Sequence, residues 1–280
     1  MVCRSLTLPA PAKLNINLRI LGRRADGLHE IDSVMTLVDF ADSVSVARRE
    51  DGRIVRRWSH PQVRDDLCAR AARLLQRVAG ARAGADIAVQ KKIPVGGGLG
   101  GGSSNAASVL LALNVLWQTR LRRGELRALA AKIGADAPFF IFRRPARARG
   151  AGERLADTKI SFLQKYKYYL LVFPNALASS AKVYAEYENL TSGRAKRKIS
   201  GVLINNVNHL AEAVFHLHPP VAEAARILRR AAGEARLSGG GACVYAAFSR
   251  RAEARAAQAA LPAGLNSAVA AAWRRGKNDL

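Results

Sequence analysis

Six of the seven residues at 96–102 are glycine, and this run constrains the local fold more than any other feature of the chain. Glycine inside a helix or strand costs about 0.5–1 kcal/mol relative to alanine, so such a run needs a reason. Two reasons fit: left-handed backbone angles, and a close approach of main-chain N–H groups to another molecule. An apolar stretch with helical spacing follows at 104–117. The sequence therefore predicts a glycine loop that opens a helix.

The loop and the helix start together favour a phosphate site. The first turn of a helix has N–H groups without intrahelical partners and carries a partial positive charge, which suits phosphate oxygens. We expect the helix cap among Ser103, Ser104 and Asn105. The alternative, a flexible linker, fits poorly because linkers do not run straight from a strand into an apolar helix. The predicted phosphate-binding residues are Pro94, Val95, Gly96, Gly97, Gly98, Leu99, Gly100, Gly101, Gly102, Ser103 and Ser104.

Two common nucleotide motifs do not explain the run. Gly97 and Gly102 have the spacing of the Walker phosphate loop, but Ser103 stands where that loop requires lysine. The letters G-x-G-x-x-G also occur. However, a dinucleotide fold would end a strand with Asp or Glu about twenty residues later, and this chain has threonine, leucine and arginine there. The nucleotide site is therefore of another kind.

Hydrophobic periodicity predicts strands alternating with helices along the whole chain. Strands are expected at 14–20, 34–40, 43–46, 87–89, 139–142, 168–173 and 242–248. Helices are expected at 67–78, 104–117, 125–133, 201–215, 221–232 and 252–261. A polar stretch at 150–165 interrupts this pattern, so we expect two domains, 1–157 and 158–280, built of α+β layers.

The formal net charge of +24 leaves three explanations open. It fits a nucleic-acid binder, electrostatic attraction of polyanionic substrates, or a compositional bias towards arginine. The basic clusters lack the interleaved aromatics of single-strand binders, so we favour the bias and expect no nucleic-acid partner. The apolar helix within the uncharged stretch 93–119 is shorter than the about 20 residues that cross a bilayer, so we expect no membrane partner. Three scattered cysteines without metal-ligand spacing indicate a reduced, cytoplasmic setting.

Five motifs in this order resemble those of the GHMP small-molecule kinases, which include galactokinase, homoserine kinase and mevalonate kinase. They are PAKLNINL at 11–18, RADGLHEI at 24–31, PVGGGLGGGSSNA at 94–106, IGADAPFF at 133–140 and LSGGGACVYAAF at 237–248. The resemblance implies ATP-dependent phosphorylation of a small-molecule alcohol. It also implies a two-domain fold, with an N-terminal α/β domain, a ferredoxin-like C-terminal domain and the active site between them.

The resemblance assigns chemistry to residues inside these motifs. Lys13 and Asp136 would flank the acceptor hydroxyl: Asp136 accepts its proton, while Lys13 keeps Asp136 ionised and offsets charge on the transferring group. Taken alone, Lys13 would be a surface lysine and Asp136 a helix cap. Lys91 and Asp66 match positions near the nucleotide. Mg²⁺ would bridge the β- and γ-phosphates, with no protein ligand evident.

A closer match within the family implies a substrate that carries a cytidine diphosphate group, bound by a monomer or homodimer. Leu28 replaces a tyrosine that stacks on cytosine, a contact worth about 1–3 kcal/mol, and Asp66 replaces an asparagine. Another GHMP kinase with a different alcohol and, distantly, a basic nucleic-acid-binding protein on a kinase-like fold remain alternatives. The glycines at 239–241 fit a second phosphate-closing loop or a tight turn at a strand entry. The matched substrate positions are Asn15, Leu28, His29, Ser180, Tyr184 and Gly240.

Overall fold

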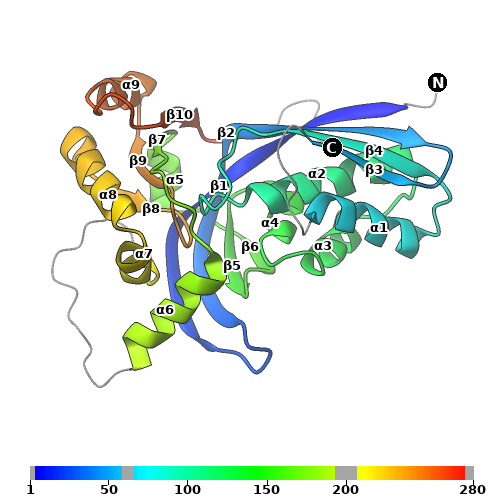
Figure 1. Cartoon of the computed structure of the whole chain (residues 1–280), viewed down its shortest axis with the longest axis horizontal. Coiled ribbons are helices and arrows are strands. Elements are labelled where there is room, and N and C mark those ends of the chain that lie inside the picture. Colours follow the sequence, from blue (N-terminus) through cyan, green and yellow to red (C-terminus); the bar gives the residue numbers. More distant parts are fainter. Residues whose placement is uncertain (1–3, 59–65, 193–206, 275–280) are drawn as a thin grey trace.

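The computed structural model describes residues 4–58, 66–192 and 207–274, and these residues form two sheets covered by helices (Figure 1). The first sheet contains β1 (Ser5–Arg23), β2 (His29–Arg49), β3 (Ile54–Trp58), β4 (Gly84–Gln90), β5 (Ala146–Gly150) and β6 (Arg154–Asp157). The second sheet contains β7 (Tyr168–Val172), β8 (Arg236–Leu237), β9 (Val244–Phe248) and β10 (Ser267–Ala271). The expected two-domain α+β architecture is confirmed.

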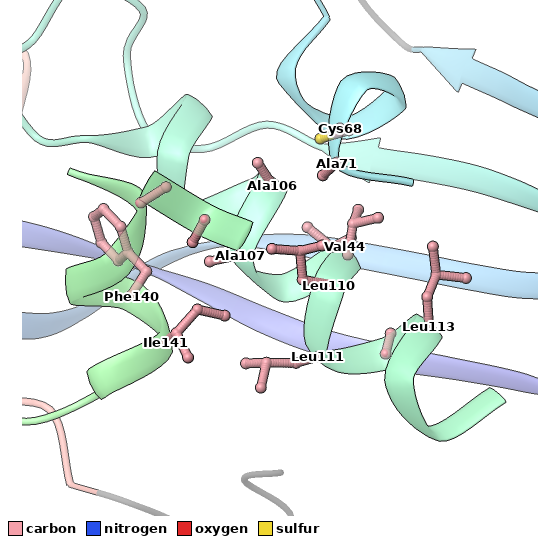
Figure 2. Packing of buried hydrophobic residues seen from close by; sticks show 14 of the residues in the cluster. Val44, Cys68, Ala71, Ala106, Ala107, Leu110, Leu111, Leu113, Phe140 and Ile141 are labelled. Atoms are coloured by element: carbon pink, nitrogen blue, oxygen red, sulfur yellow. The ribbon is translucent and has the colours of Figure 1, made fainter. Parts of the chain in front are cut away.

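Four helices cover one side of the first sheet: α1 (Leu67–Ala79), α2 (Gly101–Leu116), α3 (Arg123–Ala131) and α4 (Ala137–Phe142). Helix α2 lies at the centre of this layer, where Ala106, Leu110 and Leu113 are fully buried (Figure 2). A helix that is apolar all round belongs in a core, which explains the long uncharged stretch. The second unit contributes α5 (Ser161–Lys165), α6 (Ser180–Ser192), α7 (Ala211–Leu217), α8 (Pro219–Ala232) and α9 (Arg251–Ala259).

Strands β1 and β2 form a long antiparallel hairpin that links the two units. One end of β2 pairs with β4 over Ser43–Arg49, and the other end pairs with β5 over Ile31–Met35. The hairpin turn extends away from the helical layer towards α6 (Figure 1). Leu18 of β1 also forms a bridge with Asn208 of the second unit. The β1–β2 hairpin therefore extends from the core of the first unit to the second unit.

Most predicted elements are present, and three differ from the prediction. The strand predicted at 139–142 is wrong, because these residues form α4. Phe139, Phe140 and Ile141 have β propensity, but Pro138 lies in the first turn of a helix, and packing on α2 overrides the propensity. The strands predicted at 34–40 and 43–46 are one continuous strand, β2.

The helix predicted at 201–215 falls partly outside the described residues, at 201–206. Within the described part, Asn208 forms its bridge to Leu18, and helix α7 begins only at Ala211. The boundary at 157/158 stays a prediction; the first sheet ends at Asp157 and the second begins at Tyr168. Across the described ranges, no helix is both long and apolar enough to span a membrane.

Candidate active site

The glycine loop, residues 96–102, is fixed to the second unit through its carbonyl groups. The Gly96 carbonyl accepts hydrogen bonds from the N–H groups of Ala242 at 3.0 Å and Ala178 at 3.3 Å. The Gly97 carbonyl accepts from the Cys243 N–H at 3.0 Å. The Gly98 carbonyl accepts from the Ser238 hydroxyl at 3.2 Å. Such regular anchoring excludes a flexible linker.

The N–H groups of the same segment are available for a ligand. Within the described part of the chain, the N–H groups of residues 96–103 donate no hydrogen bond. The first intrahelical bond of α2 runs from the Ser104 N–H to the Gly100 carbonyl at 2.9 Å. An anion site at the start of a helix requires this arrangement, in which the loop carbonyl groups are hydrogen-bonded to the protein and the loop N–H groups are not.

The helix cap differs from the prediction that placed it among Ser103, Ser104 and Asn105. Helix α2 begins at Gly101, its N-cap is Gly100, and no side chain makes a capping hydrogen bond. Ser104 is already inside the helix, and its hydroxyl donates to the Pro11 carbonyl at 2.7 Å. A side-chain cap would occupy the N–H groups of the first turn, whereas a glycine leaves them open.

Gly98 and Gly100 show why the loop needs glycine. Both have left-handed backbone angles, with φ of 69° and 70°. A Cβ atom on Gly98 would lie 2.2 Å from the Ser238 carbonyl oxygen, and one on Gly100 would lie 2.7 Å from the Phe140 ring. The loop is therefore packed against backbone and an aromatic ring at distances that only glycine permits.

Lys13 and Asp136 lie beside this loop and face each other. The Lys13 ammonium is 3.7 Å from the Asp136 carboxylate, and the two side chains are 5% and 36% exposed. The Lys13 N–H donates to the Leu99 carbonyl at 2.9 Å, which ties strand β1 to the glycine loop. The Lys13 ammonium also donates to the Asn15 side chain, whose amide donates to the Ser33 hydroxyl at 2.8 Å. Lys13 is therefore a buried, oriented cation.

The Asp136 carboxylate is not used as a helix cap. Asp136 is the N-cap residue of α4, yet its side chain makes no capping hydrogen bond. Its carboxylate lies next to Lys13 and lines a cavity of about 790 Å³ between the two units. This geometry contradicts both purely structural alternatives, in which Lys13 is a surface lysine and Asp136 caps a helix.

The cavity brings together most of the predicted site residues. It is lined by Lys13, Asn15, Asp66, Lys91, Pro94, Val95, Leu99, Ser103, Asp136, Ser180, Tyr184, Gly240 and the six glycines of the loop. Ser104, Leu28 and His29 are not in its lining. Ala151 and Ala178 also line the cavity; sequence reasoning missed them because alanine carries no chemical signal.

The turn end of the hairpin lies against α6. The His29 ring stacks on the Tyr184 ring with centroids 4.6 Å apart, and its Nε2 atom lies 3.0 Å from the Glu188 carboxylate. Burial, and secondarily the negative charge of Asp136, raises the pKa of Tyr184 to about 12, so its phenol stays neutral. Leu28 is 51% exposed. The predicted contacts of Leu28 and His29 with substrate stay predictions.

Asp66 is held in place by its neighbours. One carboxylate oxygen accepts the Cys68 N–H at 3.1 Å and caps α1, and the other lies 3.1 Å from the Arg56 guanidinium. The negative charge that this aspartate adds near the nucleotide site is thus offset by arginine.

Asp42 is a site residue that the sequence did not reveal. Its side chain is completely buried and forms an ion pair with the Lys91 ammonium. Its other oxygen accepts the N–H groups of Lys92 at 2.7 Å and Ile93 at 2.8 Å. A Cβ on Gly101 would lie 3.2 Å from the Lys91 ammonium. Asp42 therefore places the Lys91 charge beside the start of α2.

Replacing Asp42 by alanine should destabilise the fold strongly. Asp42→Ala leaves the Lys91 ammonium, which is 11% exposed, without its counter-ion, a change that costs about 3–5 kcal/mol in buried pairs. Urea denaturation measures this as a loss of unfolding free energy. Asp42→Ala combined with Lys91→Met should recover most of it, because no buried charge remains. Wild-type stability of the single variant would contradict the assigned pairing.

Comparisons with known proteins agree with this geometry. The family model for the GHMP kinases N terminal domain matches residues 66–144, and the model for the GHMP kinases C terminal domain matches residues 188–267. The chain is 45% identical to 4-diphosphocytidyl-2-C-methyl-D-erythritol kinase of Alkalilimnicola ehrlichii, over 94% of this chain and 89% of that protein. The chain belongs to the GHMP kinase family. The GHMP kinases are ATP-dependent small-molecule kinases, so this protein is an enzyme of that class and the expected family is confirmed.

Further members of the GHMP kinase family match along nearly the whole chain. The enzyme of the same name from Thiobacillus denitrificans is 43% identical over 95% of both chains. A crystal structure of 4-(cytidine 5'-diphospho)-2C-methyl-D-erythritol kinase superposes with a TM-score of 0.76 at 32% identity, covering 95% of this chain and 98% of that one. Homoserine kinase from Cytophaga hutchinsonii superposes with a TM-score of 0.69 over 98% and 96%, at 16% identity, and shares the fold.

Proposed function

We propose that this kinase transfers the γ-phosphate of ATP to the 2-hydroxyl of 4-diphosphocytidyl-2-C-methyl-D-erythritol, in the non-mevalonate route to isoprenoids. The observation that carries the chemistry is the Lys13–Asp136 pair, 3.7 Å apart, beside a loop whose N–H groups are unengaged. The choice of alcohol is supported by the names of relatives that are 45% and 43% identical over nearly the whole chain.

The residues divide the work of phosphoryl transfer. The N–H groups of residues 96–103 and the Lys91 ammonium hold the ATP phosphates at the start of α2. The acceptor oxygen attacks the γ-phosphorus, its proton passes to Asp136, and the bond to the leaving ADP oxygen breaks. Lys13, 3.7 Å from the Asp136 carboxylate, orients that carboxylate and offsets negative charge on the transferring group. The protein thus supplies positioning and charge, which is what this reaction needs.

Mg²⁺ fits the cavity as an ion that would enter it bound to ATP. Among the described residues, no three carboxylate, histidine or cysteine side chains cluster as a metal site. Asp66 and Asp136 are the carboxylates in the cavity lining, and Asp66 is engaged by Arg56 and the start of α1. We therefore infer that, of the carboxylates that the structure describes in the cavity, Asp136 is the one free to hold Mg²⁺, with phosphate oxygens and water supplying its other ligands, and that the ion would neutralise phosphate charge.

We assign the cytidine end of the substrate to the part of the cavity near α6. Tyr184 and Ser180 of α6 line it, as do Asn15 of β1 and Gly240. His29 at the start of β2 stacks on Tyr184, and Leu28 precedes it in the hairpin turn. An aromatic ring beside a polar, amide-bearing wall suits a nucleobase with an attached diphosphate. Gly239, Gly240 and Gly241 lie in the turn between β8 and β9 and line the same cavity.

A substrate panel tests the proposed function. Purified protein with ATP and Mg²⁺ is given 4-diphosphocytidyl-2-C-methyl-D-erythritol, homoserine, mevalonate or galactose, and ADP release is followed by a coupled assay. Turnover is expected with the cytidine substrate alone. Turnover with one of the other alcohols, and none with the cytidine substrate, would show a different GHMP kinase.

Leu28→Tyr should improve binding of the cytidine substrate. An aromatic ring at this half-exposed position can stack on the base, and such stacking is worth about 1–3 kcal/mol. The KM for the cytidine substrate should fall at least about fivefold. The KM for ATP serves as the internal control and should stay the same. An unchanged KM for both would place the base away from the hairpin.

We further infer a cytoplasmic monomer or homodimer without a nucleic-acid partner. Cys68 and Cys243 are buried free thiols, which suits a reducing compartment. Basic residues are spread along the sequence, and the cavity is sized for small molecules rather than a polymer.

A further inference from the structure

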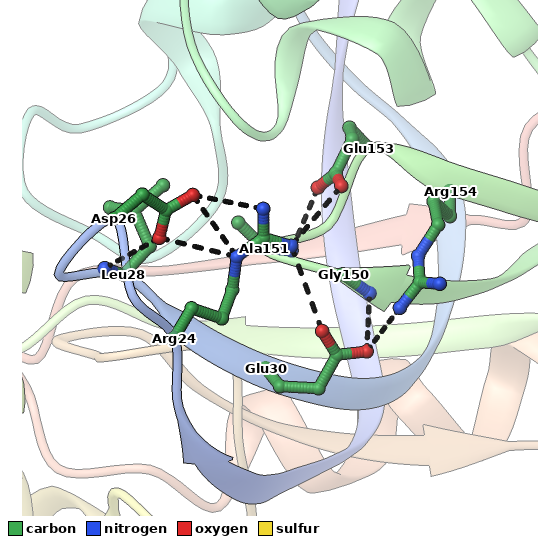
Figure 3. Close-up of polar contacts among 8 residues, drawn as sticks. All are labelled: Arg24, Asp26, Leu28, Glu30, Gly150, Ala151, Glu153 and Arg154. Carbon is green, nitrogen blue, oxygen red and sulfur yellow. Dashed lines mark hydrogen bonds and ion pairs between the residues drawn. The ribbon is translucent and has the colours of Figure 1, made fainter.

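The turn that joins β1 to β2 is built around Arg24 (Figure 3). Its guanidinium donates to the Asp26 carboxylate from Nε at 3.1 Å and from Nη2 at 2.9 Å. Asp26 accepts the Leu28 N–H at 3.1 Å, and the Arg24 N–H donates to the Leu28 carbonyl at 2.7 Å. These bonds close the turn on itself just before His29. They fix the chain segment that leads into β2, whose Ile31 lines the hairpin end of the cavity.

The remaining nitrogen of Arg24 faces a second segment, residues 150–153, which we name the Gly150 turn. Nη1 lies 3.6 Å from the Glu30 carboxylate and 3.6 Å from the Glu153 carboxylate. Glu30 accepts the Gly150 N–H at 3.1 Å, and Glu153 accepts the Ala151 N–H at 2.7 Å. Both carboxylates that hold the Gly150 turn therefore converge on one guanidinium (Figure 3).

Without Arg24, two carboxylates would face each other at short range. Arg154 donates to Glu30, but no ion pair other than that with Arg24 is found for Glu153 within the described ranges. Like charges at this separation repel, and the Gly150 turn is the segment that would shift. Arg24 therefore adds to the β2–β5 pairing at Ile31 and Gly150 a contact that joins the hairpin turn to the Gly150 turn through both carboxylates.

The Gly150 turn lies beside Asp136, the proposed proton acceptor. A Cβ on Gly152 would lie 3.4 Å from the Ala135 carbonyl oxygen and 3.8 Å from an Asp136 carboxylate oxygen. Gly152 has a φ of 126°, a conformation that side chains disfavour. Ala151 of the same turn lines the cavity. The position of this turn thus sets the space beside the Asp136 carboxylate.

We propose that Arg24 is a positioning residue for phosphoryl transfer, which holds the Gly150 turn against Asp136 and couples it to the hairpin end of the cavity. The inference rests on the proposed function, since it gives Asp136 the role of proton acceptor. Arg24 does not touch the reacting atoms; it acts through Glu30, Glu153 and the backbone that they hold.

Catalysis and stability should respond differently to loss of Arg24. Partly exposed ion pairs contribute little to folding, so the melting temperature should change only slightly. A shift of about 1 Å near reacting groups can cost about 100-fold in rate. A role in positioning therefore lowers kcat without a matching loss of stability, whereas a purely structural role lowers stability first.

A double-mutant cycle on the full chain tests the proposal. Arg24→Gln, Glu153→Gln and the double variant are compared with the wild type for kcat, both KM values and melting temperature. We expect Arg24→Gln to lower kcat about 10- to 100-fold, with the KM for ATP within about twofold of wild type. The double variant should be no slower than the slower single variant, because both changes release the same turn.

Arg49→Gln is a matched control. Arg49 makes the same kind of turn at the far end of β2: its guanidinium donates to Asp51 at 2.9 Å, and Asp51 accepts the Arg53 N–H at 3.1 Å. This turn does not line the cavity. Arg49→Gln should leave kcat within about twofold of wild type, although it removes a comparable network.

Three results would overturn the proposal. One is wild-type kcat in Arg24→Gln, and another is a loss of kcat matched by an equal loss in Arg49→Gln. The third is a double variant whose loss equals the product of the single losses, which would mean that Arg24 does not act through Glu153. If the wild type phosphorylates a different alcohol, the proposed substrate fails, while the same cycle on that alcohol still decides the role of Arg24.

Discussion

Asp136→Asn should lower kcat by about 10²–10⁴-fold, the range for loss of a general base. Asparagine keeps the shape of the side chain but cannot accept the proton of the acceptor hydroxyl. It also removes the negative charge that faces Lys13 at 3.7 Å. The change is measured by coupled ADP release at saturating concentrations of both substrates. Rates near those of the wild type would contradict the proposed mechanism.

The fold should survive this substitution. The Asp136 side chain makes no capping hydrogen bond, so α4 loses no contact when the carboxylate becomes an amide. The melting temperature should fall, because the buried Lys13 ammonium loses its ion pair with Asp136, but the fall should be limited because Lys13 keeps its hydrogen bond to Asn15. The affinity for ATP is expected to stay close to wild type. Asp157→Asn is a matched control, because this exposed aspartate pairs with Arg144 at 2.7 Å and does not line the cavity. It should leave kcat unchanged.

Gly98→Ala should destabilise the protein by about 2–5 kcal/mol and weaken ATP binding severely. Alanine at a φ of 69° is strained by about 1–2 kcal/mol, and its methyl group would meet the Ser238 carbonyl oxygen at 2.2 Å. Relieving such an overlap costs about 1–3 kcal/mol more and moves the loop. Urea denaturation gives the loss of unfolding free energy, and ATP titration gives the loss of affinity.

Gly102→Ala is the matched control for stability. A Cβ at Gly102 meets only the Leu67 side chain, at 3.4 Å, and the residue lies inside the first turn of α2. Alanine is favoured over glycine in a helix by up to about 1 kcal/mol, so stability should stay the same or rise. Equal stability of the two variants would mean that the close approach of Gly98 to the second unit is not what the loop depends on.

The glycine run allowed the phosphate loop to be predicted because its signal is local. Six glycines before an apolar helix have few structural uses, and the backbone angles of Gly98 and Gly100 follow from that pattern. The hydrophobic periods at 14–20 and 67–78 also gave correct elements, since one face of each is buried. Lys13 and Asp136 needed the family resemblance, because either residue alone has a commoner structural explanation.

The rest could not be predicted because it depends on contacts that only the tertiary structure creates. The aromatic residues of α4 suggested a strand, and burial against α2 decided otherwise. Asp42 lies within a strand far along the chain from Lys91, and nothing in the sequence links the two. Ser104 seemed a natural cap, yet Pro11 takes its hydroxyl hydrogen bond.

The carbonyl bonds of the glycine loop also constrain motion. Gly96, Gly97 and Gly98 accept hydrogen bonds from the second unit. A hinge motion that separated the two units would therefore have to break these hydrogen bonds or move the loop. The hydrogen bonds that position the loop for nucleotide binding therefore also restrict movement between the two units. The amide protons of Ala242 and Cys243, which donate to the loop carbonyl groups, should exchange with deuterium more slowly once ATP is bound.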